Sequence, residues 1–217
     1  MNTAVDTIVA YDAATVHAMM MSVAQAMIDQ VDTLTDADRV IGDGDHGIGM
    51  RRGFEAVLET LKTRQDDSVE GVFKTVGSAL LSNTGGAAGA VFGTWFRSGS
   101  KALAGVDALD AESLGRFLDV GLEAVLKRGG AALGHKTMMD AVAPAAEAAR
   151  AQTGKDFSDG IAAAVDGAVK GVESTRDMVA MTGKARSLGE RSLGHIDPGA
   201  LSVSLILKAM RDFDARS

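Results

Sequence analysis

The chain has 217 residues, of which 46% are hydrophobic and only 4% are aromatic, and its formal net charge is −7. This length and charge predict one domain over residues 1–217, with neither nucleic acid nor an anionic membrane as its main partner. The lack of cysteine excludes disulfides and thiol catalysis and favours a reducing cytoplasm. We expect no signal peptide and no membrane span, because no basic leader or long apolar run is present.

Apolar residues at helical spacing predict a series of amphipathic helices joined by glycine-rich connections. The first helix covers roughly 12–31, and an acidic segment at 32–38 then leads into a glycine loop. Later helices are predicted from Met50, over 69–82, after the small residues at 85–90, over 114–128, from 134–138, over 161–172 and from 198 onward. No strand and no composition break is evident. We therefore expect an all-α domain of about eight helices, with its glycine-rich loops gathered at one end.

Residues 41–50 read Ile-Gly-Asp-Gly-Asp-His-Gly-Ile-Gly-Met and set two carboxylates, Asp43 and Asp45, among glycines. A third carboxylate, Asp38, precedes them. Like charges brought this close repel one another, and a hard divalent cation removes that repulsion. Oxygen ligands without cysteine suit Mg²⁺ or Ca²⁺ better than zinc, and glycines let the backbone approach a ligand closely. The pattern predicts a metal site beside a phosphate site.

Three other interpretations of this stretch exist. Residues 42–47 fit the dinucleotide-binding pattern, but aspartates stand where a pyrophosphate would lie and no strand precedes them. An EF-hand loop from Asp43 would need glutamate at its twelfth position, where Phe54 stands. A solvated turn, with Asp45 capping the following helix, stays open as a purely structural interpretation.

Three later segments also have two interpretations each. The small residues at 85–90 suit either close helix packing or a helix N-terminus that binds an anion. The segment 183–196 mixes three basic residues with three glycines, unlike a passive connector, and its His195 is either structural or catalytic. Asp197 is the predicted N-cap of the last helix, with Pro198 at its first position, and a ligand role for Asp197 stays equally open.

Four motifs then occur in an order that resembles one family. They are Ile-Gly-Asp-Gly-Asp-His-Gly at 41–47, Gly-Gly-Ala-Ala-Gly at 85–89, Lys-Thr-Met-Met-Asp at 136–140 and Leu-Gly-Glu-Arg-Ser-Leu-Gly-His-Ile-Asp-Pro-Gly-Ala at 188–200. Together they strongly resemble the L subunit, the nucleotide-binding domain, of dihydroxyacetone kinases. The resemblance covers roughly 12–214, and its first and last motifs are the most specific. It implies a closed barrel of antiparallel helices that binds ADP or ATP at its rim through two Mg²⁺ ions.

The resemblance also assigns residues and a partner. Asp38, Asp43 and Asp45 match the metal-holding aspartates of the family, and with Lys184 they are the expected catalytic residues. Nucleotide contacts are implied for His46, Gly47, Ile48, Gly49, Ala87, Ala88, Gly129, Met138, Lys184, Asp197, Pro198 and Gly199. The ketone would be held by a separate K-type subunit, so the chain alone is expected to be inactive. Phosphoryl transfer then depends mainly on positioning and charge neutralisation, and no general base is assigned within this chain.

The sequence departs from the family pattern at five places. Gly49, Ala88, His135 and Lys184 stand where asparagine, serine, aspartate and arginine are usual, and Arg-Ser at 186–187 replaces Ser-Tyr. The lost polar contacts at Gly49 and Ala88 and the lysine at 184 predict an exchangeable nucleotide and a preference for ATP as donor, with a phosphoprotein relay as the alternative. The acceptor stays open between dihydroxyacetone, a four-carbon ketose and an acyl group. A non-catalytic nucleotide sensor that docks on a regulator is the alternative from another functional class.

Overall fold

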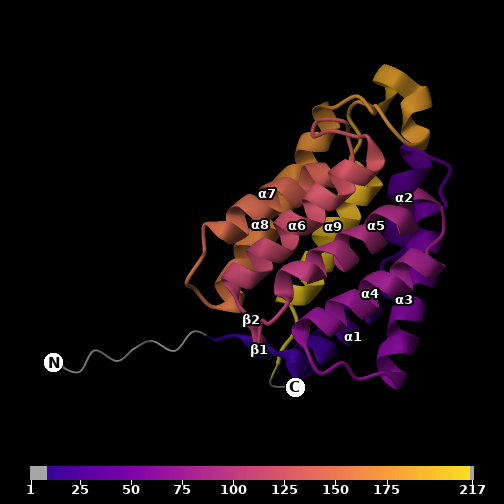
Figure 1. Ribbon diagram of the computed structural model, residues 1–217. Helices are drawn as coiled ribbons and strands as arrows, with labels where there is room; N and C mark the ends of the chain where they lie inside the picture. The colour runs from indigo at the N-terminus through magenta and orange to yellow at the C-terminus, as the bar shows by residue number, and fades with distance from the viewer. Residues whose placement is uncertain (1–8, 216–217) are drawn as a thin grey trace.

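The computed structural model describes residues 9–215, and this part of the chain is almost entirely helical (Figure 1). The described residues form nine α-helices: α1 Ala13–Asp29, α2 Val31–Ile41, α3 His46–Thr63, α4 Val69–Asn83, α5 Gly86–Gly99, α6 Ala111–Gly129, α7 Met139–Arg150, α8 Phe157–Ser174 and α9 Pro198–Arg211. They also include three 3₁₀ helices: η1 Ser100–Leu103, η2 Thr175–Asp177 and η3 Lys184–Ser192. The predicted all-α class is confirmed. Within residues 9–215, every helix is too short or too polar to cross a membrane.

One short strand pairing escaped the sequence prediction. The strand β1, Tyr11–Asp12, pairs in antiparallel fashion with β2, Ala108–Leu109. Two residues are too few to show the alternation of apolar and polar side chains that marks a strand. The pairing ties the start of α1 to the connection before α6, and the fold remains helical.

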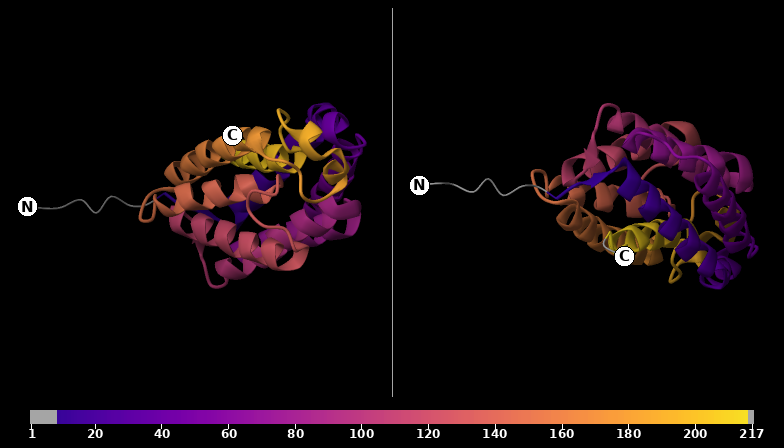
Figure 2. Two further views of the ribbon diagram at one scale, coloured as in Figure 1. Left: turned by 90° about the horizontal axis from the view of Figure 1, so that it is seen from above. Right: turned by 90° about the horizontal axis from the view of Figure 1, so that it is seen from below.

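The helices form a ring in which each one packs against the next from α3 to α9, and α9 and α3 both contact α1. Figures 1 and 2 show this arrangement, with α2 and η3 together at one end. Successive helices alternate in direction, so the connections α2–α3, α4–α5, α6–α7 and α8–α9 all reach that end (Figure 1). The glycine-rich connections thus gather at one end of the domain, as the sequence predicts.

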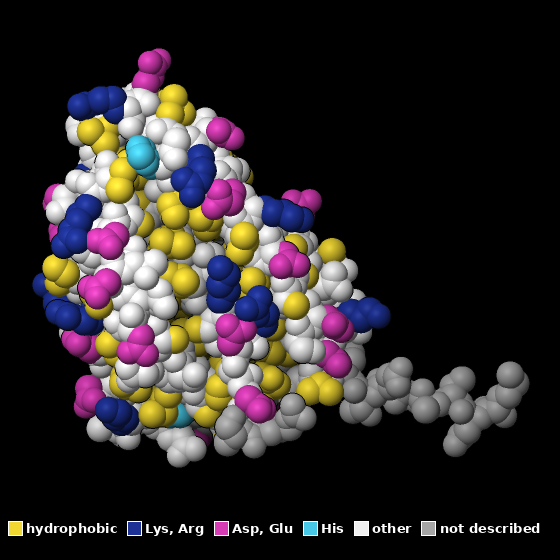
Figure 3. Space-filling model, turned by 180° about the vertical axis from the view of Figure 1, so that it is seen from behind, with side chains coloured by type: hydrophobic (Ala, Val, Ile, Leu, Met, Phe, Trp, Pro, Cys, Tyr) yellow, Lys and Arg dark blue, Asp and Glu magenta, His cyan; other side chains and the backbone are white. Residues whose placement is uncertain are grey.

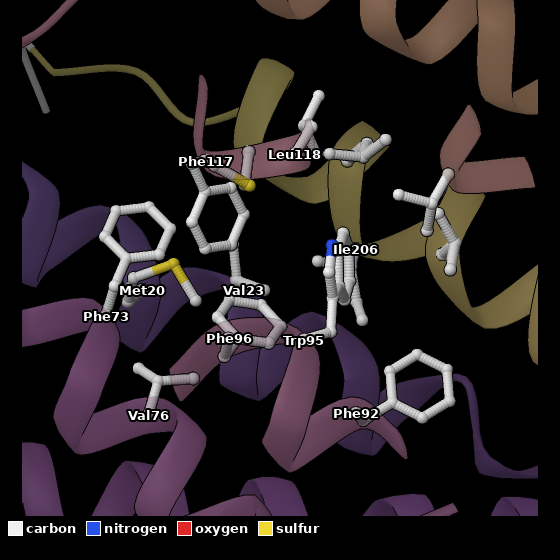
Figure 4. Close-up of a cluster of buried hydrophobic side chains, with 14 of the residues drawn as sticks. Met20, Val23, Phe73, Val76, Phe92, Trp95, Phe96, Phe117, Leu118 and Ile206 are labelled. Carbon is white, nitrogen blue, oxygen red and sulfur yellow. The ribbon is translucent and has the colours of Figure 1, made fainter. Parts of the chain in front are cut away.

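Aromatic and aliphatic side chains fill the centre of the ring (Figure 4). The rings of Phe73 and Phe117 lie 4.6 Å apart between centroids, and those of Trp95 and Phe96 lie 5.0 Å apart. Met20 is completely buried among the same helices. Burying a Phe or Met side chain stabilises a fold by about 1.5–3 kcal/mol. This cluster therefore holds the helices of the ring together.

Two glycines let α4 and α5 approach backbone to backbone. A Cβ atom at Gly77 would lie 2.4 Å from the backbone nitrogen of Arg97, and a Cβ at Gly93 would lie 2.6 Å from the Cβ of Leu81. Carbon atoms do not approach other heavy atoms so closely, so any larger residue would force these helices apart. The close contact fixes how α4 and α5 lie against each other.

The acidic segment at 32–38, which the sequence analysis did not assign to a helix, is part of α2. Leu34, Asp38 and Ile41 are buried on one face of α2. Their spacing is that of an amphipathic helix, but the aspartate in the middle of the buried face hides the apolar pattern. The charged residue that obscured this helix is also one of the predicted metal ligands.

The glycine loop is shorter than its sequence suggests, because α3 begins at His46 rather than near Met50. Gly47 lies inside this helix, where an added Cβ would stand 2.3 Å from the carbonyl oxygen of Val31. The glycine therefore serves close packing of α3 on α2. The loop proper is limited to residues 42–45.

Two further connections differ from expectation in their local structure. Much of the predicted loop at 183–196 is the 3₁₀ helix η3, which bends at Gly189, where φ is 55°. Residues 134–138, expected to open a helix, form turns before α7 begins at Met139. Both segments carry glycines with positive φ, which favour tight turns over a regular helix.

The predicted ends of two helices are confirmed. α6 ends at Gly129 and is followed by Gly130 in the left-handed conformation, with φ of 61°. α9 begins at Pro198, and the Oδ2 atom of Asp197 accepts a hydrogen bond from the backbone N–H of Ala200 at 2.7 Å. Both ends belong to connections that reach the glycine-rich end of the ring.

Candidate functional site

A cavity of about 550 Å³ opens where the four connections meet, and we call it the loop-end cavity. Its walls come from the ends of α2 and α4, the starts of α3, α5, α7 and α9, and the turn that enters η3. This volume suits a small molecule or cofactor. The predicted site residues in its lining are Asp38, Asp45, His46, Gly49, Ala87, Ala88, Met138, Lys184, Asp197, Pro198 and Gly199.

Four predicted residues stand apart from this lining. Asp43 lies at the mouth of the cavity with its side chain 53% exposed, and Ile48 is 45% exposed on α3. Gly47 faces α2, as its close approach to that helix shows. Gly129 is the last residue of α6, but its surroundings lie outside what the structure describes.

Three carboxylates converge at the mouth, and we call Asp38, Asp43 and Asp45 the carboxylate cluster. One oxygen of each lies within 4.8 Å of the others. Asp38 is only 8% exposed, and its Oδ2 accepts a hydrogen bond from the backbone N–H of His46 at 3.1 Å. Gly42 leaves room for this carboxylate, because a Cβ there would lie 2.1 Å from Asp38 Oδ1. An oxygen-only donor set of this kind fits a hard divalent cation.

Asp45 occupies the N-cap position of α3, but its side chain makes no capping hydrogen bond within the described structure. Its Oδ2 instead accepts from the Nζ of Lys184 at 2.8 Å, and Lys184 also donates to Asp43. The interpretation of Asp45 as a capping side chain was therefore wrong. Its carboxylate belongs to the charged mouth of the cavity.

Lys184 compensates part of the negative charge of the cluster. Its hydrogen bonds to Asp43 and Asp45 raise the pKa of this lysine well above its usual value. The hydrogen bond from Lys184 in turn holds the pKa of Asp43 below its usual value. The ammonium group therefore remains charged at the place where the carboxylates need a cation.

His46 links the start of α3 to α9. Its Nε2 lies 2.8 Å from the Oγ of Ser202 on α9. Burial lowers the pKa of His46, and the nearby charges of Asp38 and Asp45 oppose this effect only in part. The geometry therefore suits a neutral imidazole that positions the loop at 42–45.

The start of α5 supplies a second, uncharged feature of the cavity. Gly85 and Gly86 have φ of 78° and 56°, and they precede Ala87 and Ala88 in the cavity wall. The first N–H groups of a helix lack partners within the helix and favour anions. Gly89 packs against α4, where a Cβ would lie 3.3 Å from the Cβ of Thr84. Both interpretations of the small-residue run thus fit its geometry.

Lys136 belongs to the motif at 136–140, but the sequence analysis assigned it no role in the site. It is only 3% exposed, and its Nζ donates hydrogen bonds to the carbonyl oxygens of Thr175 and His195. Burial lowers the pKa of Lys136, and the nearby charge of Asp197 partly offsets this effect. The partners lie 39 and 59 residues away in the sequence, so no local pattern could indicate them. In these contacts His195 uses its backbone, which fits the structural interpretation of that residue.

One buried carboxylate, Asp140, and one partly buried carboxylate, Asp197, complete this side of the cavity. Asp140 accepts hydrogen bonds from the backbone N–H groups of Gly134 at 2.6 Å and Thr137 at 2.7 Å, which folds the turn that carries Lys136. Asp197 caps α9, and burial raises its pKa to about 7. We call Lys136, Asp140 and Asp197 the buried polar cluster, because hydrogen bonds tie each of them to backbone groups.

The sequence model of the DAK2 domain family matches residues 40–212 of the chain. The chain belongs to the DAK2 domain family. Two curated relatives of this DAK2 domain are the "PEP-dependent dihydroxyacetone kinase 1, ADP-binding subunit DhaL" of Listeria innocua and the corresponding PEP-dependent subunit of Escherichia coli K12. Each is 40% identical to this chain, over 177 residues for the Listeria protein and 179 for the Escherichia protein. The aligned region covers 82% of this chain in both cases, and 84% and 85% of the two relatives respectively. The resemblance to the L subunit is thereby confirmed.

Larger proteins contain a similar DAK2 domain. The L-erythrulose 1-kinase of Mycolicibacterium smegmatis is 33% identical over 89% of this chain, which spans 34% of that enzyme. The crystal structure of the dihydroxyacetone kinase from C. freundii in complex with AMP-PNP and Mg²⁺ matches with a TM-score of 0.71 and 26% identity. That match covers 98% of this chain and 36% of the kinase, so this DAK2 domain spans about a third of that protein.

Proposed function

We propose that this chain is the nucleotide-binding, phosphoryl-transfer subunit of a dihydroxyacetone-type kinase, working with a separate K-type subunit that holds the ketone. The observation that carries the proposal is the carboxylate cluster at the mouth of a cavity that also contains the start of α5. A cation site beside a helix N-terminus has the chemistry needed to hold a metal–polyphosphate. The 40% identity to relatives named as ADP-binding DhaL subunits supports the same function.

The residues at the mouth fit Mg²⁺ together with ADP or ATP. Asp38, Asp43 and Asp45 would hold the metal, and the number of two ions follows from the family resemblance. When bound, Mg²⁺ would neutralise negative charge on the phosphate groups. Lys184 adds a permanent positive charge beside the phosphates, while the N–H groups at the start of α5 would hold phosphate oxygens. Positioning and charge neutralisation are thus the contribution of this chain.

The relatives also favour particular reaction partners. Those with 35–40% identity are named as subunits of PEP- or PTS-dependent kinases, which supports a phosphoprotein relay as donor rather than free ATP. Dihydroxyacetone is the proposed acceptor for the same reason. A four-carbon ketose is the second candidate, and the 33% identity to an L-erythrulose 1-kinase favours it over an acyl acceptor.

A reconstitution assay tests this function. The purified chain is mixed with a K-type subunit and either dihydroxyacetone or erythrulose, and with either ATP or a PEP-driven phosphoprotein relay. We expect turnover only when the K-type subunit is present, and faster turnover with the relay than with ATP. Turnover by the pure chain alone would contradict the proposal. Mg²⁺-dependent ADP binding without turnover in any mixture would favour the sensor alternative.

A further inference from the structure

A second cavity, of about 430 Å³, lies between α4, α5 and α6, which stand side by side in Figure 1. We call it the basic groove, and its lining residues are Glu70, Lys74, Leu81, Thr94, Arg97, Ser98, Ser100, Lys101 and Arg128. It shares no lining residue with the loop-end cavity. The function proposed for that cavity therefore leaves the groove unexplained.

Positive charge is concentrated in the groove. Four cations and one carboxylate line it, a formal charge of +3 in a chain whose net charge is −7. Within residues 9–215, none of the four cations forms an ion pair. Other surface cations do form pairs, such as Lys62 with Glu59 and Arg116 with Glu112. On the face opposite Figure 1, Lys and Arg side chains likewise lie among Asp and Glu side chains (Figure 3).

Hydrogen-bond donors dominate the rest of the lining. Thr94 and Ser98 add hydroxyl groups to the lining, whereas the hydroxyl of Ser100 is buried and already donates to the carbonyl oxygen of Arg97. Glu70 is the only carboxylate among the lining residues. A surface that offers ammonium, guanidinium and hydroxyl donors against a single anionic acceptor is complementary to an anion.

The packing of the helices explains why a hollow exists here. Gly77 and Gly93 bring α4 and α5 into backbone contact, and short side chains such as Thr94 and Ser98 cover the outer side of α5. The four exposed cations belong to the lining of this hollow. Because each of α4, α5 and α6 packs against its neighbours in the ring, the backbone that carries these cations is already in place before a ligand binds, which lowers the entropic cost of binding.

We propose that the basic groove is a binding site for a small molecule that carries two or more phosphate groups. Its volume lies in the range of small-molecule sites, and four cations exceed what one phosphate group needs. Arg97 and Arg128 can each form two parallel bonds to such a group, whereas Lys74 and Lys101 act as point charges. The acidic chain as a whole disfavours nucleic acid as the occupant.

The test uses tripolyphosphate as the probe, titrated calorimetrically into the full chain in low salt with EDTA, so that no metal-dependent binding contributes. The double variant Arg97→Gln/Lys101→Gln removes two charges from the groove. Lys62→Gln/Arg116→Gln is the matched control, because it removes one lysine and one arginine that are exposed and paired elsewhere. Mg²⁺–ADP binding is measured on all three proteins as a check of folding.

We expect binding of tripolyphosphate to the wild type, at least a tenfold loss of affinity in the groove variant and little change in the control. Mg²⁺–ADP binding should be the same in all three. Failure of the wild type to bind, or an equal loss in groove variant and control, would overturn the proposal. Binding of a polyglutamate peptide but not of tripolyphosphate would also overturn it and mark the groove as a surface for an acidic protein.

Discussion

On one side of the loop-end cavity Lys184 pairs with Asp43 and Asp45 in solvent, whereas on the other side Lys136 is buried and bonds to backbone carbonyls. The side chain of Lys184 is 56% exposed, and Lys136 is 3% exposed. Exposed pairs contribute little to stability and can exchange partners, while a buried charge must keep every hydrogen bond that it has. The difference separates a side suited to ligand exchange from a side that holds the fold.

The largest effect is expected when a carboxylate is removed from the exposed side of the cavity. Asp43→Ala or Asp45→Ala should weaken Mg²⁺-dependent ADP binding by about a hundredfold or more, since even losses in the second coordination shell cost about 10–100-fold. Stability without ligand should hardly change. Titration calorimetry with and without Mg²⁺ measures the first effect, and denaturant unfolding measures the second. Asp36→Ala, which removes an exposed aspartate paired with Arg39, is the control. Unchanged affinity in the cluster variants would remove the metal assignment.

The second prediction concerns removal of the buried cation, Lys136, on the other side of the cavity. Lys136→Met leaves two carbonyl acceptors and the nearby Asp197 without their cation, so the free energy of unfolding should fall by about 3 kcal/mol. The melting temperature should fall by about 6–12 °C. The matched change Lys184→Met should leave the melting temperature nearly unchanged and weaken nucleotide binding. Calorimetric melting of the ligand-free proteins decides the matter, and equal melting temperatures for both variants would contradict the contrast between the two lysines.

A smaller effect on the free energy of unfolding is expected when a change of pH alters the charge of Asp197, on the same side as Lys136. Burial raises the pKa of Asp197 from 3.8 to about 7, so the folded chain holds a proton that the unfolded chain releases above about pH 4. The free energy of unfolding should therefore fall as pH rises toward 7 and level off above it. Asn at this position keeps a capping oxygen for Ala200 but cannot titrate.

Denaturant unfolding of wild type and Asp197→Asn at about pH 5 and about pH 8 isolates this effect from other titrating groups. The wild type should lose more stability than the variant over this interval, by on the order of 2 kcal/mol. Parallel pH profiles of the two proteins would show that Asp197 titrates in the folded state much as it does in the unfolded chain.

The sequence predicted more of the residues on the exposed side of the cavity than on the buried side. Asp43 and Asp45 stand close together among glycines, so one short stretch of sequence was enough to predict the carboxylates. Their partner Lys184 lies 141 and 139 residues away, and only the family resemblance assigned it to the site. Lys136 stands in the motif at 136–140, but its partners Thr175 and His195 lie 39 and 59 residues away, and no local pattern indicates them. Helices with apolar stripes, such as α6, were predicted well. α2 was missed, because Asp38 interrupts its buried face.

The hydrogen bonds of Lys184 to Asp43 and Asp45 have a consequence for the order of events at the mouth. The lysine is a built-in counter-ion, so a free metal ion must compete with it before it can reach the carboxylates. A metal that arrives together with a polyphosphate brings a new anionic partner for the displaced ammonium group. Such joint arrival would make metal and nucleotide mutually dependent ligands, each binding poorly without the other.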